Sequence, residues 1–248
     1  MANRAALIIP ALDEEPAIGH TLDRVPRELY CEIIVADNGS RDRTAEVARA
    51  HGATVVSEPQ RGYGAACLRA MAALPRGIDA VVFMDADASD DPSEAALLLE
   101  PIYTGRADLV IGSRTLGRAE EGALEPHQIL GNRLATWMIR VWFGHRYTDL
   151  GPFRAISAEA LRNLGMRDRN YGWTIEMQIK ALRQKLRVIE VPVSYRRRIG
   201  VSKISGSWRA SIMAVCRSAS RRCCQRTRLN ASGSRWRVTA MPMRDKSG

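Results

Sequence analysis

Residues Val81-Val82-Phe83-Met84-Asp85-Ala86-Asp87-Ala88-Ser89-Asp90-Asp91-Pro92 join an apolar run to a cluster of carboxylates. The run has strand length, and a buried strand that stops at acidic residues places them at the carboxyl edge of a sheet, where open α/β folds bind ligands. In extended chain, Asp85 and Asp87 point the same way, with Ala86 turned aside. Two such carboxylates suit one divalent cation that keeps sites for substrate phosphate. A solvated acidic turn that caps a helix is the alternative interpretation.

The surrounding sequence predicts an α/β fold. Strands and helices alternate, which is typical of a mostly parallel central sheet with helices on both faces. Strands are expected over residues 5–10, 32–36, 53–57, 80–84, 107–112 and 188–193. Helices are expected over residues 15–25, 44–51, 92–103, 129–143, 158–164 and 173–183, and from the glycine-rich loop at 60–66 to residue 73. Residues 120–128 are expected to be mobile, and residues 148–154 to form a turn. The strand ends at Asp37, Asp85 and Gly112 should meet at one edge of the sheet.

Positive charge is concentrated at the end of the 248-residue chain. Residues 208–248 contain nine Arg, one Lys and one Asp, a net +9, whereas the whole chain is +10 and residues 1–207 therefore carry only +1. We expect one domain over residues 1–207 and a basic, disordered or irregular tail over residues 208–248. The domain needs no nucleic-acid partner. Binding of nucleic acid or of a membrane surface through the tail is an alternative function of a different class.

Several absences from the sequence indicate the cellular location. The first residues lack a signal-peptide layout, and no apolar run reaches the length of a membrane span. The five cysteines are odd in number and lack the spacing of a metal knuckle. We therefore expect a cytoplasmic protein, with peripheral contact between the tail and the inner face of the membrane.

Two further enzyme classes have motifs similar to single stretches of this chain. The loop Gly62-x-Gly64-x-x-Cys67 differs from a dinucleotide-binding fingerprint in its third small residue, and it lacks the usual lone acidic residue about 20 positions on. A haloacid-dehalogenase phosphatase also has Asp-x-Asp after a strand. There the pair normally opens the chain and precedes Gly-Thr, whereas here it is internal and precedes Ala88-Ser89.

The motifs taken together resemble the family 2 glycosyltransferases. In chain order they are Ile9-Pro10-Ala11-Leu12-Asp13-Glu14-Glu15, Val35-Ala36-Asp37-Asn38-Gly39-Ser40-x-Asp42-x-Thr44, Arg61-Gly62-x-Gly64 and Met84-Asp85-Ala86-Asp87. Three later stretches are similar to the branch that contains dolichyl-phosphate mannose synthase and polyprenyl-phosphate sugar transferases. They are Asp149-Leu150-Gly151-Pro152-Phe153-Arg154, Trp173-x-x-Glu176-Met177, and Glu190-Val191-Pro192-Val193 through Ser202-Lys203. The resemblance covers residues 4–207. Asn38 stands where the family often has Asp, and Ser89 where the branch often has Gln.

The resemblance implies a GT-A type, Rossmann-like fold and a hexosyltransferase. The enzyme would transfer a hexose, with inversion, from a UDP- or GDP-linked sugar to a polyprenyl phosphate, with Mg²⁺ or Mn²⁺ as cofactor. A soluble hydroxyl acceptor is the alternative. The oligomeric state stays open.

The resemblance also implies roles for individual residues. The metal ligands would be Asp85 and Asp87, with Ala86 between them in the donor site. The nucleoside would be lined by Pro10, Asp13, Glu14, Asp37 and Asn38, with Arg61 near the base or diphosphate. The cations available for the phosphates of donor or acceptor are Arg154, Arg196, Arg198 and Lys203. The candidates for a general base, or for positioning the acceptor, are Asp149 and Glu176.

Overall fold

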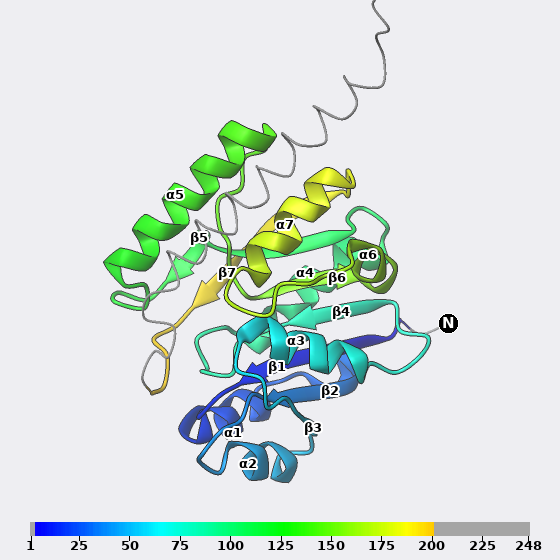
Figure 1. The fold of residues 1–248 in the computed structure, drawn as a ribbon, viewed down its shortest axis with the longest axis vertical. Coiled ribbons are helices and arrows are strands. Elements are labelled where there is room, and N and C mark those ends of the chain that lie inside the picture. The colour runs from blue at the N-terminus through cyan, green and yellow to red at the C-terminus, as the bar shows by residue number, and fades with distance from the viewer. Residues whose placement is uncertain (1–2, 201–248) are drawn as a thin grey trace, which may run out of the picture.

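The computed structural model describes residues 3–200, which form a central sheet with helices on both faces (Figure 1). The strands are β1 (Ala5–Ala11), β2 (Tyr30–Asp37), β3 (Thr54–Ser57), β4 (Ala80–Phe83), β5 (Leu109–Ala119), β6 (Arg154–Ser157) and β7 (Val188–Tyr195). The α-helices are α1 (Glu15–Asp23), α2 (Thr44–Ala50), α3 (Tyr63–Ala72), α4 (Ala95–Tyr103), α5 (Pro126–Phe143), α6 (Ala158–Leu164) and α7 (Trp173–Arg183). Short 3-10 helices are η1 (Arg27–Leu29) and η2 (Pro92–Glu94). The predicted tail over residues 208–248 and the predicted phosphate ligand Lys203 lie outside the described residues.

The strand order is β3-β2-β1-β4-β6-β5-β7. β1 pairs in parallel with β2 and β4, β2 with β3, and β5 with β7, whereas β6 is antiparallel to both β4 and β5. The prediction of a mostly parallel sheet is confirmed. β6 was missed, because four residues between an expected turn and an expected helix give too short a pattern to identify a strand.

β1 and β4 form the centre of the fold, and every residue of both strands is buried. Side chains alternate between the two faces of a strand. Ile8 therefore belongs to the core that α3, α5, α6 and α7 cover, whereas Leu7 and Ile9 belong to the core that α1, α2 and α4 cover. Because both faces are covered, these strands are apolar at consecutive positions.

β5 and α5 are both longer than the sequence analysis predicted. β5 continues past Gly112 because Arg118 and Ala119 pair with β7. The backbone of Gly117 lies so close to β7 that a Cβ on this residue would be 2.0 Å from the Val193 carbonyl oxygen, so only glycine fits there. α5 begins at Pro126, where Glu125 and Gln128 form a capping box. Residues 120–128 are therefore partly helical. None of the helices within residues 3–200 combines the length and the apolar character needed to cross a membrane.

The parallel strands bring their carboxyl ends to one edge of the sheet. Ala11 at the end of β1 is in register with Asp37 at the end of β2. The Met84 amide, just after β4, donates to the Ile8 carbonyl at 3.1 Å. Asp85 therefore leaves the sheet beside the end of β1, at the edge that the sequence predicted.

The glycine-rich loop before α3 packs against protein backbone. The Gly64 amide donates to the Asn170 carbonyl (3.1 Å) and the Ala65 amide to the Arg169 carbonyl (2.9 Å). A Cβ on Gly64 would lie 2.0 Å from the Asp168 carbonyl oxygen. These amides are thus already bonded within the chain, unlike those of a dinucleotide fingerprint, whose glycines let the backbone approach a pyrophosphate.

We predict that Gly64→Ala destabilises the protein by about 1–3 kcal/mol, because the added methyl group collides with backbone that cannot rotate away. Helix propensity alone predicts the opposite sign, a gain of up to about 1 kcal/mol. Urea denaturation of the two proteins measures the difference in the free energy of unfolding.

Gly19→Ala is the matched control in helix α1. The nearest atom to a Cβ there is Nε2 of the His51 side chain, at 2.9 Å, and this ring can shift. We expect the control to be neutral or slightly stabilising. A Gly64→Ala protein as stable as wild type would contradict the close approach of residues 168–170 to α3.

Candidate active site

A pocket opens at the carboxyl edge of the sheet, next to the ends of β1 and β4. Its lining residues are Pro10, Ala11, Leu12, Glu14, Asn38, Tyr63, Ala66, Asp85, Ala86, Asp87, Tyr171 and Arg198. The predicted site residues among them are Pro10, Glu14, Asn38, Asp85, Ala86, Asp87 and Arg198. Residues far apart in the sequence thus converge on the Asp-x-Asp motif.

Asp87 is buried and both of its carboxylate oxygens have partners. Oδ1 accepts hydrogen bonds from the Ser89 amide (3.0 Å) and hydroxyl (2.5 Å), and Oδ2 forms an ion pair with Arg198. Ser89, which replaces the Gln frequent in the resembling branch, therefore orients Asp87. Arg198 is the cation that faces this carboxylate inside the pocket.

Asp85 and Asp90 add negative charge beside Asp87. Asp85 Oδ1 accepts from the Tyr63 hydroxyl at 3.1 Å, and its amide donates to Asp90 Oδ2 at 3.3 Å. Two effects raise the pKa of Asp85 to about 7: burial, which is the larger, and the negative charge of Asp87. Burial, with Asp85 and Asp87, also raises the pKa of Asp90 well above its usual value. Asp90 Oδ1 is buried without a hydrogen-bond partner among the described residues.

This crowding of carboxylates fits a bound cation. Carboxylates that raise one another's pKa are stabilised in their ionised form by positive charge. Residues 3–200 contain no group of three or more His, Cys, Asp or Glu side chains placed to hold a metal ion. A cation on Asp85 and Asp87 would therefore take further ligands from substrate or water, as Mg²⁺ commonly does.

Asn38 holds the loop that leads to the glycines. Its Nδ2 donates to the carbonyl oxygens of Glu58 (3.0 Å) and Gln60 (2.8 Å), and its Oδ1 accepts from the Gly62 amide (2.8 Å). An Asp at this position would lack the two donors. The departure from the family pattern at residue 38 thus has a local structural reason.

Three other residues predicted to bind the nucleotide are not in the pocket lining. Asp13 Oδ1 accepts from the Arg41 amide (2.7 Å) and Asp37 Oδ1 from the Ser40 amide (3.1 Å). Arg61 Nη2 donates to the Gly39 carbonyl at 3.0 Å. These contacts shape the loop beside the pocket, and direct nucleotide contact by these three residues stays a prediction.

The structure places Arg154, predicted to contact phosphate, in the core and not in the pocket lining. Its side chain is fully buried, and its guanidinium donates to the carbonyl oxygens of Gly151 (Nε, 3.1 Å), Leu150 (Nη2, 3.2 Å) and Thr174 (Nη1, 3.1 Å). Burial lowers the pKa of Arg154 to about 10. Because β6 begins at this residue, the side chain enters the core and ties the 150–151 turn to α7.

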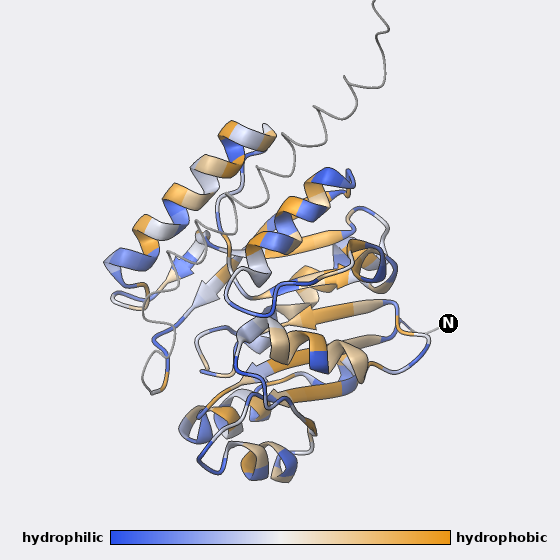
Figure 2. Ribbon diagram, viewed as in Figure 1, coloured by the Kyte–Doolittle hydropathy of each residue, from blue (hydrophilic) through white to orange (hydrophobic). Residues whose placement is uncertain are grey.

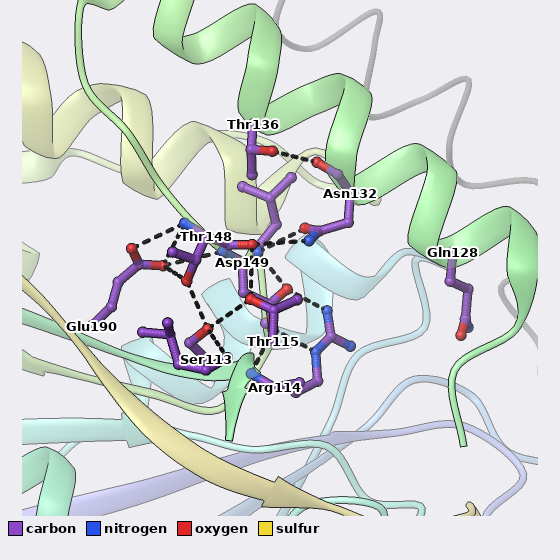
Figure 3. Close-up of polar contacts among 12 residues, drawn as sticks. Ser113, Arg114, Thr115, Gln128, Asn132, Thr136, Thr148, Asp149 and Glu190 are labelled. Atoms are coloured by element: carbon purple, nitrogen blue, oxygen red, sulfur yellow. Dashed lines mark hydrogen bonds and ion pairs between the residues drawn. The ribbon is translucent and has the colours of Figure 1, made fainter. Parts of the chain in front are cut away.

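Asp149, predicted as a candidate base, is buried in an ion pair with Arg114. Its Oδ1 and Oδ2 accept from Arg114 Nη2 (2.7 Å) and Nε (2.8 Å), and Oδ2 also accepts from the Arg114 amide (2.8 Å; Figure 3). Burial works to raise the pKa of Asp149, but the hydrogen bonds and charge of Arg114 outweigh it and leave the pKa lowered. A buried carboxylate occupied in this way is poorly suited to take a proton.

Glu176, the second candidate base, stabilises a loop instead. Its carboxylate accepts from the amides of Arg167 (3.0 Å) and Asp168 (2.8 Å) and forms an ion pair with Lys180 (2.7 Å). Glu176 does not line the pocket. Its effect there is indirect, because the loop that it holds leads to Tyr171 in the pocket wall.

Arg196 is oriented differently from Arg198. Its guanidinium pairs with Asp91 at 2.6 Å, and Arg24 pairs with the same carboxylate at 2.9 Å. It does not line the pocket, so its predicted role in phosphate binding is not supported. The spacing of Arg196 and Arg198 in the sequence could not separate the two.

Three residues at or near the pocket were not predicted from the sequence, namely Tyr63, Tyr171 and Arg114. Tyr63 lies inside the glycine motif, where an aromatic residue at the first position of a helix gave the only signal. Arg114 packs over the Tyr195 ring at 5.0 Å and joins Asp149 to β7. The role of Arg114 depends on its ion pair with Asp149, which lies 35 positions away in the sequence, so no local pattern reveals it.

We predict that Asp149→Asn destabilises the protein by about 3 kcal/mol at neutral pH, because removing one partner of a buried ion pair leaves Arg114 uncompensated. The folded-state pKa of Asp149 is lowered, so its contribution is present above the unfolded pKa of about 3.9 and is lost as the pH falls through the lower folded pKa. Denaturant titrations of both proteins at neutral and acid pH measure this dependence.

Asp108→Asn is the matched control. Asp108 forms a similar pair with Arg187, at 2.6 Å, but at the surface. A cost of only about 0–1 kcal/mol is expected for it. Equal losses in the two variants would contradict a special role for the buried pair.

Comparisons with known proteins agree with the fold. The family model described as glycosyl transferase family 2 matches residues 6–165. An uncharacterized glycosyltransferase of Mycobacterium tuberculosis is 37% identical over 211 residues, covering 84% of this chain and 93% of that protein. The undecaprenyl-phosphate mannosyltransferase of Micrococcus luteus is 31% identical over 223 residues, covering 82% and 88%.

A solved structure has the same architecture. Glucosyl-3-phosphoglycerate synthase from Mycobacterium tuberculosis, in complex with Mn²⁺, UDP-glucose and phosphoglyceric acid, superimposes with a TM-score of 0.73 at 25% identity, over 88% of this chain and 80% of that one. The predicted GT-A type fold is thereby confirmed. The dehydrogenase and phosphatase alternatives are set aside, and the chain belongs to glycosyl transferase family 2, as a glycosyltransferase of the polyprenyl-phosphate sugar transferase branch.

Proposed function

We propose that this glycosyltransferase moves a hexose, with inversion, from a UDP- or GDP-linked sugar to a polyprenyl phosphate. The observation that carries the proposal is the pocket in which Asp85, Asp87 and Arg198 converge at the sheet edge. A relative that is 31% identical is named an undecaprenyl-phosphate mannosyltransferase, which supports a lipid phosphate as acceptor.

On the donor side, Asp85 and Asp87 would hold Mg²⁺ or Mn²⁺ together with the donor diphosphate. The cation would neutralise the negative charge that develops on the leaving nucleoside diphosphate. Mn²⁺ accompanies UDP-glucose in the solved relative, which supports a divalent cofactor. Arg198 would exchange its contact with Asp87 for phosphate oxygens, to which a planar guanidinium can donate two hydrogen bonds.

The nucleoside would lie along Pro10, Glu14 and Asn38. Tyr63 and Tyr171 would add aromatic surface for the base, since both line the pocket. The contribution of Asp13, Asp37 and Arg61 would be to hold the loop beside the pocket in place, through the hydrogen bonds described above. UDP and GDP remain equally compatible with this lining.

A phosphate acceptor suits the catalytic groups. An acceptor phosphate oxygen would form a bond to the sugar C1 while the bond from C1 to the donor diphosphate breaks, and the nucleoside diphosphate leaves. The attacking oxygen is already anionic, so no proton has to be removed. Asp149 and Glu176, the proposed bases, are both engaged outside the pocket, and this favours a phosphate over a hydroxyl acceptor.

A soluble acceptor is the second candidate. The solved relative contains phosphoglyceric acid, a small molecule that carries both a phosphate and a hydroxyl group. This candidate reaction uses the same donor pocket, but its product is a water-soluble glycoside and not a glycolipid. Binding of nucleic acid or lipid by the tail concerns residues outside the described range.

We predict that incubation with a labelled UDP- or GDP-hexose, Mn²⁺ and a polyprenyl phosphate yields labelled lipid that partitions into organic solvent. The same mixture with phosphoglyceric acid in place of the lipid should yield no labelled product. Label in the soluble product alone would contradict the lipid acceptor, and absence of both products would contradict the donor assignment.

Arg198→Gln and Arg196→Gln form a matched pair for this assay. Loss of a charge-assisted hydrogen bond typically costs about 1.5–3 kcal/mol, so Arg198→Gln should lower kcat/KM by about tenfold to a hundredfold. Arg196→Gln should change it little, because Arg196 pairs with Asp91 outside the pocket. Equal effects would contradict the distinct position of Arg198.

A further inference from the structure

Helix α5 exposes an apolar stripe. Its members are Leu130 (68% exposed), Leu134 (37%), Trp137 (59%) and Val141 (57%). At about 100° per residue, these four positions fall within an arc of about 60°. The helix packs on the core through Ala135, Met138 and Ile139, which are buried. Figure 2 shows apolar and polar residues alternating along this peripheral helix.

The charges on α5 are all of one sign. No Asp or Glu occurs from Pro126 to Phe143, while Arg133 and Arg140 are exposed. Both arginines project to the same side of the stripe, about 60–80° from Leu130. Glu125, just before the helix, is paired with His127 at 3.0 Å. The helix therefore combines exposed Leu and Trp with a cationic border, the pattern of helices that lie in a lipid interface.

The same helix is hydrogen-bonded to the turn at residues 148–150. Asn132 Nδ2 donates to the Thr148 carbonyl (3.2 Å), and Asn132 Oδ1 accepts from the Leu150 amide (3.0 Å). Between these two residues, Asp149 holds Arg114 (Figure 3). The position of α5 is thereby fixed relative to the sheet edge that carries the carboxylates.

We propose that α5 docks the enzyme on an anionic lipid surface, with Leu130, Leu134, Trp137 and Val141 inserted at the level of the headgroups and Arg133 and Arg140 on the lipid phosphates. The proposal rests on the proposed function in one respect, since a polyprenyl phosphate acceptor would be reached from such a surface. The docking itself is independent of catalysis.

Charge argues against two other occupants of the stripe. A symmetric contact between two copies of α5 would set the arginines of one copy near those of the other, because the same patch is used twice. Residues 208–248 carry +9, so they too would be repelled by Arg133 and Arg140. An anionic lipid surface complements both the apolar stripe and its charged border.

Vesicle co-sedimentation of the full chain, without any sugar donor or acceptor, tests the docking. We expect binding to phosphatidylcholine vesicles that contain phosphatidylglycerol, and a loss of at least about tenfold for Trp137→Glu. Arg133→Gln and Arg140→Gln should each weaken binding about fivefold, and only when the anionic lipid is present. Leu97→Glu is the matched control, because Leu97 is 50% exposed on α4, which packs on the opposite face of the sheet.

Quenching by brominated lipids separates α5 from the basic tail. If Trp137 inserts, brominated lipid should quench wild-type fluorescence more than that of Trp137→Phe, whose binding is retained. Equal quenching, or equal binding by Trp137→Glu and wild type, overturns the proposal. A dimer in solution that Trp137→Glu dissociates would overturn it as well, in favour of a second copy.

An assay of sugar transfer to a short, water-soluble polyprenyl phosphate separates failure of the docking from failure of the proposed function. Trp137→Glu should retain transfer to that acceptor and lose transfer to long-chain polyprenyl phosphate in vesicles. If wild type transfers to neither, the proposed function fails, while the vesicle measurements still decide the docking.

Discussion

Crowding of negative charge at the end of a buried strand is the constraint on which the site depends. β4 ends in the core, so Asp85, Asp87 and Asp90 leave the sheet close together with little water to separate their charges. Carboxylates in such surroundings need positive charge or hydrogen-bond donors. Arg198, Ser89 and Tyr63 supply part of this need from three separate segments. The negative charge that these three residues leave uncompensated would favour the binding of a cation together with a nucleoside diphosphate.

A scaffold of polar contacts to backbone keeps these segments in place. Arg154 donates to the carbonyls of the turn before β6, and Glu176 accepts from the amides of the loop before α7. Asn38 holds the loop that leads to the glycines. Asp149 holds Arg114, which packs on Tyr195 at the end of β7. Charged and polar side chains of the kinds found in catalytic sites thus have structural roles here. They form hydrogen bonds with the backbone amides and carbonyls that irregular segments at a sheet edge leave without partners.

The sequence predicted the elements with strong local patterns, such as the apolar run Ala5–Ile9, and the carboxylates that follow β4. It missed β6, which is only four residues long and becomes a strand through pairing with β4 and β5. It also could not separate Arg198 from Arg196, or recognise Asp149 as the partner of Arg114, since both distinctions depend on residues more than 30 positions away. Several of the residues predicted from motifs thus line one pocket, whereas the partners of single charged residues depend on tertiary structure.

Calorimetric titration of the protein with UDP and with GDP, each with and without Mn²⁺, tests the central claim most directly. Wild type and Asp91→Asn, which alters a carboxylate outside the pocket, should bind one of the nucleotides tightly and only with the metal. Asp87→Ala should lose this metal-dependent binding while remaining folded. Metal-dependent binding that survives in Asp87→Ala, or its absence from a folded wild-type protein, would contradict the assignment of the Asp85–Asp87 pair as the donor site.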